Sequence, residues 1–293
     1  MTALTTRTAL GAAAVRPRTG RRTLHLVAEH APAIALCVAF AAPLIISVLT
    51  AFMTQRQAGT GSVLPHPWRW NNFRAVFDAM PFLHDLYNTV LYAVLSALGT
   101  VLSSVPVAYA LSRLRWRGRE VVFLLVLSTM MIPAQVTSLP LYVLYANLHW
   151  IGSLKPLIVP SFFGDAFSIF LLRQFFMTLP AEMIEAARVD GANEFRILTR
   201  VVVPVAKPAI AAVGLFAFLY AWNDFYNPLL YTGNSTTGQT LAVALSQLAK
   251  SGHQGAYQLQ MAASLMFLAP VLVIFFLAQR VFVEGITTTG VKG

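Results

Sequence analysis

Long apolar runs alternate with short polar segments along most of this chain. Six of the runs predict helices that span a membrane: residues 31–53, 87–111, 121–145, 157–177, 209–231 and 261–282. Each is long enough to cross a hydrocarbon core about 30 Å thick at about 1.5 Å per residue. Pro133 and Pro140 interrupt the third run, so a kink or an opened backbone is expected there. The pattern predicts an all-α membrane protein with six transmembrane helices.

The segments between and around these runs predict a simple domain organisation. Residues 54–85 contain Trp68 and Trp70 and predict a loop with a short interfacial helix. No internal repeat divides the chain, so a single membrane domain is expected over residues 31–283. It is flanked by an N-terminal tail of residues 1–30 and a C-terminal tail of residues 284–293.

The polar segment 181–208 has a helical pattern on both sides of a glycine. Apolar residues recur at helical spacing before and after this glycine: Met183, Ile184 and Ala187, then Phe195, Leu198 and Val202. Gly191 can adopt the positive φ of a sharp turn, and Asp190 can bond nearby backbone N–H groups. The segment is therefore predicted to fold as helix, turn and helix, ending near Pro204. An ordinary amphipathic surface loop is the alternative interpretation.

Composition and charge agree with a membrane protein. Of the 293 residues, 57% are hydrophobic and only 11% are charged, with a mean hydropathy of +0.66. The net charge of +10 is spread in short clusters between apolar runs, so it does not indicate nucleic-acid binding. With alternating spans, 16 of the 21 Lys and Arg residues fall on one side. This bias predicts that both termini and the 181–208 loop are cytoplasmic.

No arrangement of residues predicts catalysis or metal binding by this chain. The six His residues are scattered without an HExxH motif, and Cys37 is the single cysteine. A GxSxG elbow and a GxxxxGK[ST] phosphate loop are both missing from the sequence. The chain is therefore predicted not to be an enzyme, and ATP-driven work would require a partner.

Polar residues inside two spans are candidates for a solute pathway. Asp165 falls near the middle of the fourth span, and the fifth contains Trp222, Asn223, Asp224 and Asn227. Carboxylate and amide groups bond hydroxyl groups, and an indole face stacks on a sugar ring, so these residues suit a polyhydroxylated solute. Alternatively, they hold helices together or cap a helix end. Arg173, nearer the inner face, is expected to extend to the interface.

Several segments resemble a known family of transporters. In the 181–208 loop, seven residues resemble the EAA loop of permease subunits of bacterial ABC importers: Glu185, Ala186, Ala187, Asp190, Gly191, Ala192 and Pro204. Residues 131–145, 168–187 and 222–230 resemble the carbohydrate-uptake, maltose-type branch. The C-terminal segment EGITTTGVKG resembles a tail that reaches between the ATPases in some of these subunits, although its TTT departs from the pattern, as does Asp165.

The resemblance implies the type I ABC importer permease fold, placed in the cytoplasmic membrane of a bacterium. It implies four kinds of partner: a homologous second permease, two ATPase subunits that bind ATP and Mg, an extracytoplasmic solute-binding protein, and membrane lipid. No cofactor is expected in this chain. The EAA loop would dock in a groove of an ATPase, with Glu185 in an ion pair and with Phe195 and Leu198 filling the groove. A sugar or related polyhydroxylated solute would cross by alternating access.

Three alternatives stay open at this point. The chain could be an ion-coupled secondary carrier or channel that works without an ATPase, for which Asp165 and Pro133 are the only hints. It could belong to an ABC importer for a polyol or a glycerol phosphoester. A membrane enzyme is the third, although the sequence has no recognisable nucleophile, base or metal ligand set.

Overall fold

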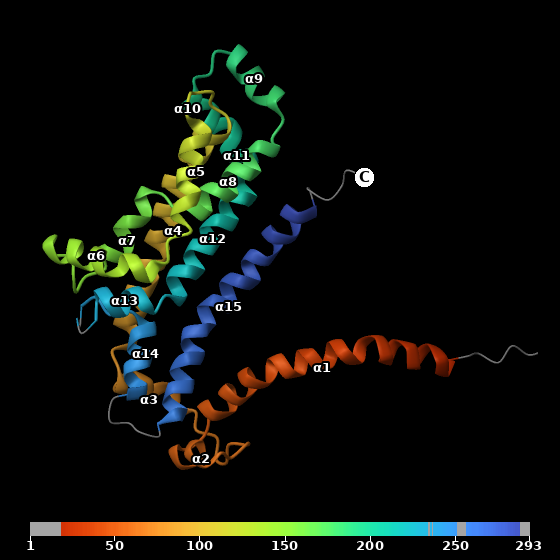
Figure 1. Cartoon of the computed structure of the whole chain (residues 1–293). Coiled ribbons are helices and arrows are strands. Elements are labelled where there is room, and N and C mark those ends of the chain that lie inside the picture. Colours follow the sequence, from red (N-terminus) through yellow and green to blue (C-terminus); the bar gives the residue numbers. More distant parts are fainter. Residues whose placement is uncertain (1–18, 234, 236, 251–255, 288–293) are drawn as a thin grey trace, which may run out of the picture. The chain divides into compact units, whose positions relative to one another are not determined.

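The computed structural model describes residues 19–233, 235, 237–250 and 256–287, and these residues form helices and connecting loops without a β-strand (Figure 1). The chain divides into two compact units, residues 1–48 and 49–293. The first unit contains most of helix α1 (Thr19–Ala51), whose apolar part His30–Ala51 could span a membrane. The helix thus begins earlier than the predicted start at residue 31. Most of the predicted N-terminal tail, and residues 288–293 of the C-terminal tail, lie outside the described residues.

The second unit contains the remaining helices. In chain order these are α2 (Gln55–Thr60), α3 (Asn71–Ala79), α4 (Phe82–Ser112), α5 (Arg119–Thr129), α6 (Ala134–Asn147), α7 (Lys155–Ile158), η1 (Val159–Phe163), α8 (Ala166–Thr178), α9 (Ala181–Val189), α10 (Glu194–Ile197), η2 (Leu198–Val202), α11 (Val203–Val205), α12 (Lys207–Asn223), α13 (Tyr226–Tyr231), α14 (Leu241–Lys250) and α15 (Tyr257–Thr287). Among the described residues, four helices could span a membrane, or up to six if each of two bent pairs is one span.

Helix α4 is the centre of this unit and packs against α8, α12 and η1 (Figure 1). Gly99 permits the close approach of η1, because a Cβ atom at this position would lie only 2.7 Å from Cδ2 of Phe162. Near the segment 181–208, one buried cluster contains Tyr109, Phe176 and Ile197. The core of the second unit is therefore built around a long apolar helix, as the run 87–111 predicted.

Two helix pairs are bent where prolines break the helical hydrogen bonding, one within the third predicted span and one just before the fifth. Helices α5 and α6 meet at 92°, with Pro133 in an extended conformation at the start of α6. The interruption predicted for the third run is thus confirmed. Residues 194–205 and helix α12 meet at 82° around Ala206, with Pro204 and Pro208 in the first turns of α11 and α12.

Helix boundaries differ from the prediction in the fourth and fifth runs. The fourth is interrupted at Gly164, whose φ is 102°, and α8 starts only after Asp165. In the fifth, α12 ends at Asn223 and a separate short helix α13 follows. Helix α14 was not predicted, although Leu241, Ala244 and Leu248 recur at helical spacing and pack in the core.

The structure shows the contacts of Arg173, which the sequence did not indicate. Its side chain is buried within the protein, since the residue is only 6% exposed. The guanidinium donates hydrogen bonds to the Leu111 carbonyl (3.1 Å) and to Glu120 (3.0 Å), and it lies over the Phe123 ring. Arg173 therefore ties α8 to α4 and α5 at the end of the bundle near the Arg-rich loop.

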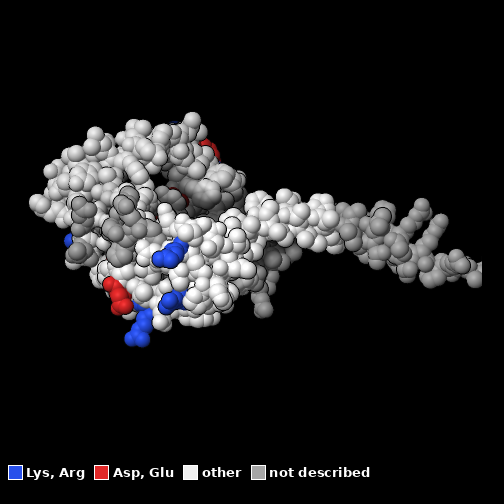
Figure 2. Space-filling view, turned by 90° about the horizontal axis from the view of Figure 1, so that it is seen from below, with Lys and Arg blue, Asp and Glu red and all other residues white. Residues whose placement is uncertain are grey.

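The two ends of the second unit differ in charge. Figure 2 views the end that carries α2 and α3, where few charged groups stand out on a mostly uncharged surface. The opposite end carries α9, α10 and the loop between α4 and α5 (Figure 1). Basic residues are frequent in these segments: Arg113, Arg115, Arg117, Arg119, Arg188, Arg196 and Arg200. The charge asymmetry predicted from the sequence is thus a property of the folded unit.

Candidate docking element and pathway residues

The segment 181–208 folds around a glycine turn. Helix α9 ends at Val189, and Gly191 follows with φ of 78° and open space where a Cβ atom would lie. The Asn193 side chain accepts a hydrogen bond from the Arg196 backbone N–H at 2.8 Å and so caps α10. The predicted helix, turn and helix are therefore confirmed, and the turn needs a positive φ at Gly191.

One face of this element is buried and the other is exposed. Ile184, Ile197 and Val202 pack into the same core cluster as α4 and α8. The exposed face carries Phe195, 75% exposed, and Val189, 88% exposed. Large apolar side chains left in contact with solvent at a turn are typical of a surface that binds a partner.

The seven residues of the EAA pattern are distributed over this face and its edge. Five of these residues are exposed, namely Glu185, Ala186, Asp190, Gly191 and Pro204, and two are partly buried, namely Ala187 and Ala192. Leu198 was predicted to fill a partner's groove, but it is 8% exposed and packs in the core cluster. This prediction is wrong because Leu198 lies on the inward face of its helix, next to Ile197.

A network of polar side chains ties the candidate docking element, residues 181–208, to α4. Tyr109 of α4 donates a hydrogen bond of 2.6 Å to Oε2 of Glu194, and Arg188 donates one of 3.0 Å to Oε1. The bond with Glu194 raises the pKa of Arg188, which keeps this guanidinium charged. The Glu194 carboxylate thereby connects α9 and α10 with the central helix. Sequence reasoning missed this network, because Tyr109 and Glu194 are far apart along the chain.

Arg113, the residue after α4, connects this helix to the end of α8. Its Nε donates to the Phe176 carbonyl at 2.9 Å, and its Nη2 donates to the carbonyls of Phe176 and Leu179. These carbonyls belong to the last turn of α8 and the residue after it, where intrahelical donors run out. Burial lowers the pKa of Arg113. The sequence marked Arg113 only as part of a basic loop, without indicating this contact.

The candidate pathway group consists of Asp165, Trp222, Asn223, Asp224 and Asn227, and Asp224 joins several elements within it. Its Oδ2 accepts a hydrogen bond of 2.8 Å from the Tyr92 hydroxyl of α4 and one of 3.0 Å from the Asn227 side chain. Its Oδ1 accepts from the Asn227 backbone N–H at 3.2 Å. Asp224 thus joins α12 and α13 to α4, which agrees with the alternative that it holds helices together. Its carboxylate is only partly buried.

At the end of α12, Trp222 is buried and Asn223 is exposed. Trp222 is 1% exposed, and its ring stacks between Phe218 at 5.5 Å and Phe267 at 5.3 Å. The prediction that its indole face stacks on a sugar is therefore wrong for this conformation, because both faces are covered. Asn223 is exposed and donates to the Leu219 carbonyl at 2.8 Å.

Asp165 caps a helix rather than lying within one. Its side chain accepts a hydrogen bond of 2.8 Å from the Ser168 backbone N–H at the start of α8. Tyr220 is exposed and lies within Coulombic range of both Asp165 and Asp224. The two acids and the Tyr220 hydroxyl therefore flank one region between α8 and α12. Among the described residues, no three His, Cys, Asp or Glu side chains gather as a metal ligand set.

Several apolar helices, some bent at prolines, define a multi-span membrane protein, and the segment 181–208 leaves an exposed turn at one end. Residues 104–288 match the family of binding-protein-dependent transport system inner membrane components, and the chain belongs to this family. It is thus a permease subunit of an ATP-driven importer, a transmembrane component without catalytic activity of its own. Multi-pass insertion in the inner membrane follows.

Individual relatives support this assignment. The chain is 33% identical to the sn-glycerol-3-phosphate transport system permease UgpE of Yersinia pestis bv. Antiqua (strain Antiqua) over 83% of this chain and 89% of the relative. It is 34% identical to the arabinooligosaccharide transport system permease AraQ of Bacillus subtilis, over 78% and 81%. A crystal structure of a bacterial ABC transporter that imports the acidic polysaccharide alginate superposes with a TM-score of 0.72 at 25% identity, covering 92% of this chain and 99% of that one.

Proposed function

We propose that this permease carries a sugar or a related polyhydroxylated solute into the cell. The similarity to AraQ carries this proposal, and the similarity to UgpE favours a glycerol phosphoester as the second candidate. The two solutes share hydroxyl groups, but a phosphoester adds negative charge that Asp165 and Asp224 would repel. Among the described residues of the pathway group, the acids and Asn223 thus favour the neutral solute.

The proposed assembly contains two permeases, two ATPases and an extracytoplasmic solute-binding protein. ATP and Mg would be held by the ATPases and no cofactor by this chain. The exposed face around Gly191 would dock in a groove of one ATPase, with Phe195 as the apolar anchor and Glu185 in an ion pair. Val189 would join this anchor, while Leu198 supports the turn from the core.

The proposed topology places six spans in the membrane, with the bent pair of α5 and α6 as one span and α12 as another, and with both termini in the cytoplasm. The 82° bend at Ala206 supports it, because it sets residues 194–205 off the axis of α12. Closure of the ATPases on ATP would move the docking element, and Tyr109 would pass this movement to α4 through Glu194. Since α4 also contacts Asp224, the docking element and the pathway group share one helix.

A reconstituted transporter tests the solute. The chain would be co-purified with its partner permease, ATPases and binding protein, placed in liposomes, and supplied with arabinooligosaccharides, maltooligosaccharides, glycerol or glycerol 3-phosphate. We expect a sugar to stimulate ATP hydrolysis several-fold and to be taken up, with no stimulation by glycerol 3-phosphate. Stimulation by glycerol 3-phosphate alone would replace the sugar by the phosphoester. Uptake by the purified chain without ATPases would instead identify a secondary carrier.

A further inference from the structure

Two adjoining clefts lie at the Arg-rich loop between α4 and α5. The larger, of about 360 Å³, is lined by Arg115, Trp116, Gly118, Arg119, Glu120 and Val121. The smaller, of about 160 Å³, is lined by Ser112, Arg113, Arg115, Arg119, Ala181, Ile184, Glu185 and Arg188. Arg115 and Arg119 line both, so the two clefts share a wall. Guanidinium groups are thereby concentrated between the loop and the docking helix α9.

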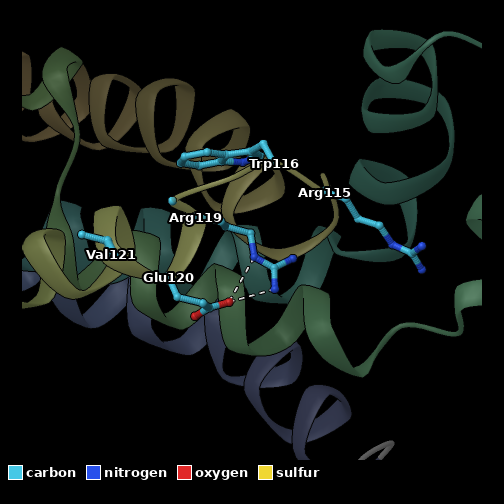
Figure 3. A pocket seen from close by; sticks show the side chains of 6 residues that line it. Arg115, Trp116, Arg119, Glu120 and Val121 are labelled. Atoms are coloured by element: carbon cyan, nitrogen blue, oxygen red, sulfur yellow. Dashed lines mark hydrogen bonds and ion pairs between the residues drawn. The ribbon is translucent and has the colours of Figure 1, made fainter.

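Among the residues that the structure describes, one of these guanidinium groups lacks a polar partner. Arg119 is paired with Glu120 at 2.8 Å, Arg188 with Glu194 at 3.0 Å, and Arg113 binds backbone carbonyls. Arg115 is exposed and makes no hydrogen bond or ion pair with any described residue; Figure 3 shows it extending from the loop away from the Arg119–Glu120 pair. A guanidinium fork of this kind matches the geometry of a phosphate group.

The loop that carries the clefts joins two candidate spans, since one ends at Ser112 and the next begins at Arg119. In the proposed topology this loop lies at the membrane surface, at the level of the lipid headgroups. Trp116 donates its indole N–H to the Ala110 carbonyl at 3.1 Å and leaves its ring partly exposed, as is common at this depth. A ligand bound here would therefore meet both phosphate-binding groups and the apolar membrane.

An apolar track leads away from the larger cleft along α5. Val121 lines the cleft, and Val121, Leu124 and Leu125 are among the exposed large apolar side chains of this helix. Such side chains can pack against an acyl chain, whereas a soluble anion would gain nothing from contact with an apolar surface. The combination of a free guanidinium, a Trp ring and an apolar track distinguishes a lipid from a free phosphate ion.

We propose that these clefts bind the phosphate group of an anionic phospholipid, with an acyl chain along α5. Arg115 supplies the main contact, because Arg119 and Arg188 are already paired with Glu120 and Glu194. Because Ile184 and Glu185 of α9 line the smaller cleft, a bound headgroup also steadies the docking element against the loop. Only this last consequence rests on the proposed docking of an ATPase.

Lipid binding to the full chain with its partner subunits tests the site. Dioleoylphosphatidylglycerol would be titrated into the detergent-solubilised complex, bound lipid would be counted by native mass spectrometry, and dioleoylphosphatidylcholine would serve as the neutral lipid. Arg115→Gln should weaken phosphatidylglycerol binding about five-fold. The matched control is Arg117→Gln, because Arg117 is exposed on the same loop but lines neither cleft. Equal losses in both variants would overturn the site in favour of unspecific attraction.

Two further arms separate the possible ligands. If millimolar inorganic phosphate displaces the lipid from the unaltered protein, the site recognises a free anion and the lipid proposal is overturned. If Arg115→Gln weakens binding of the purified ATPase in phosphatidylcholine alone, the arginine belongs to a protein interface, which also overturns it. The lipid arm needs neither ATP nor solute, so its outcome is separate from that of the transport experiment.

Discussion

Gly191 determines the shape of the docking turn through its backbone rather than through its packing. Its φ of 78° costs an L-residue about 1–2 kcal/mol, and no atom lies within 4 Å of where a Cβ would stand. Residue type alone predicted this turn, since a glycine between two helical patterns has few other uses. Residue type could not reveal Tyr109 and Glu194, whose contact depends on how α4 passes the loop.

Glu185 and Gly191 are expected to control coupling between ATP hydrolysis and uptake. Glu185→Lys reverses an exposed charge on the docking face, and Gly191→Pro forbids the positive φ. In the reconstituted transporter, each should reduce uptake per ATP hydrolysed on the order of ten-fold.

Two control variants isolate these effects. Glu182→Lys makes the same charge change on an exposed position of the same helix, outside the EAA pattern, and Gly191→Asn retains access to positive φ. Both controls should keep most of the coupling. Normal coupling in Glu185→Lys and Gly191→Pro would remove the docking assignment, and equal losses in the controls would indicate a general disturbance of the loop.

At the scale of helices, hydrophobic pattern predicted the existence of the elements better than their ends. The run 87–111 became α4 because an apolar sequence without a breaker continues as a helix. Asp165 was misplaced because the break at Gly164 depends on a φ of 102°, which hydropathy does not show. The polarity of Asp165, like that of Asp224, marks it in the sequence, but its capping bond to Ser168 depends on the fold.

Packing of η1 on α4 is expected to depend on Gly99. A Cβ at residue 99 would lie 2.7 Å from the Phe162 ring and against the Ser161 hydroxyl, so Gly99→Ala forces the two elements apart. Overpacking of this kind costs about 1–3 kcal/mol. The purified protein in detergent should therefore unfold at a lower temperature in a thermal unfolding assay.

Gly214→Ala is the matched control for this helix contact. Its Cβ would meet Val101 at 3.4 Å, an ordinary contact distance, within another apolar helix. This variant should be as stable as the parent protein or slightly more stable, because alanine favours a helix. If Gly99→Ala were equally stable, η1 would not pack on α4 as described.

At the scale of the whole molecule, the two ends of the second unit differ in charge and define an orientation. Gly59 lies in α2 at the weakly charged end, and Arg117 lies in the basic loop between α4 and α5. Cytoplasmic loops are enriched in Lys and Arg, so Arg117 should face the cytoplasm and Gly59 the outside. Cysteine placed at each position on a Cys37→Ser background reports its side of the membrane. A membrane-impermeant maleimide should label Gly59→Cys in spheroplasts but label Arg117→Cys only after permeabilisation.

Labelling in the opposite pattern would invert the proposed topology and place the docking element on the side without ATP. Since importers hydrolyse ATP in the cytoplasm, that single result would also contradict the role proposed for Glu185, whichever solute the permease carries.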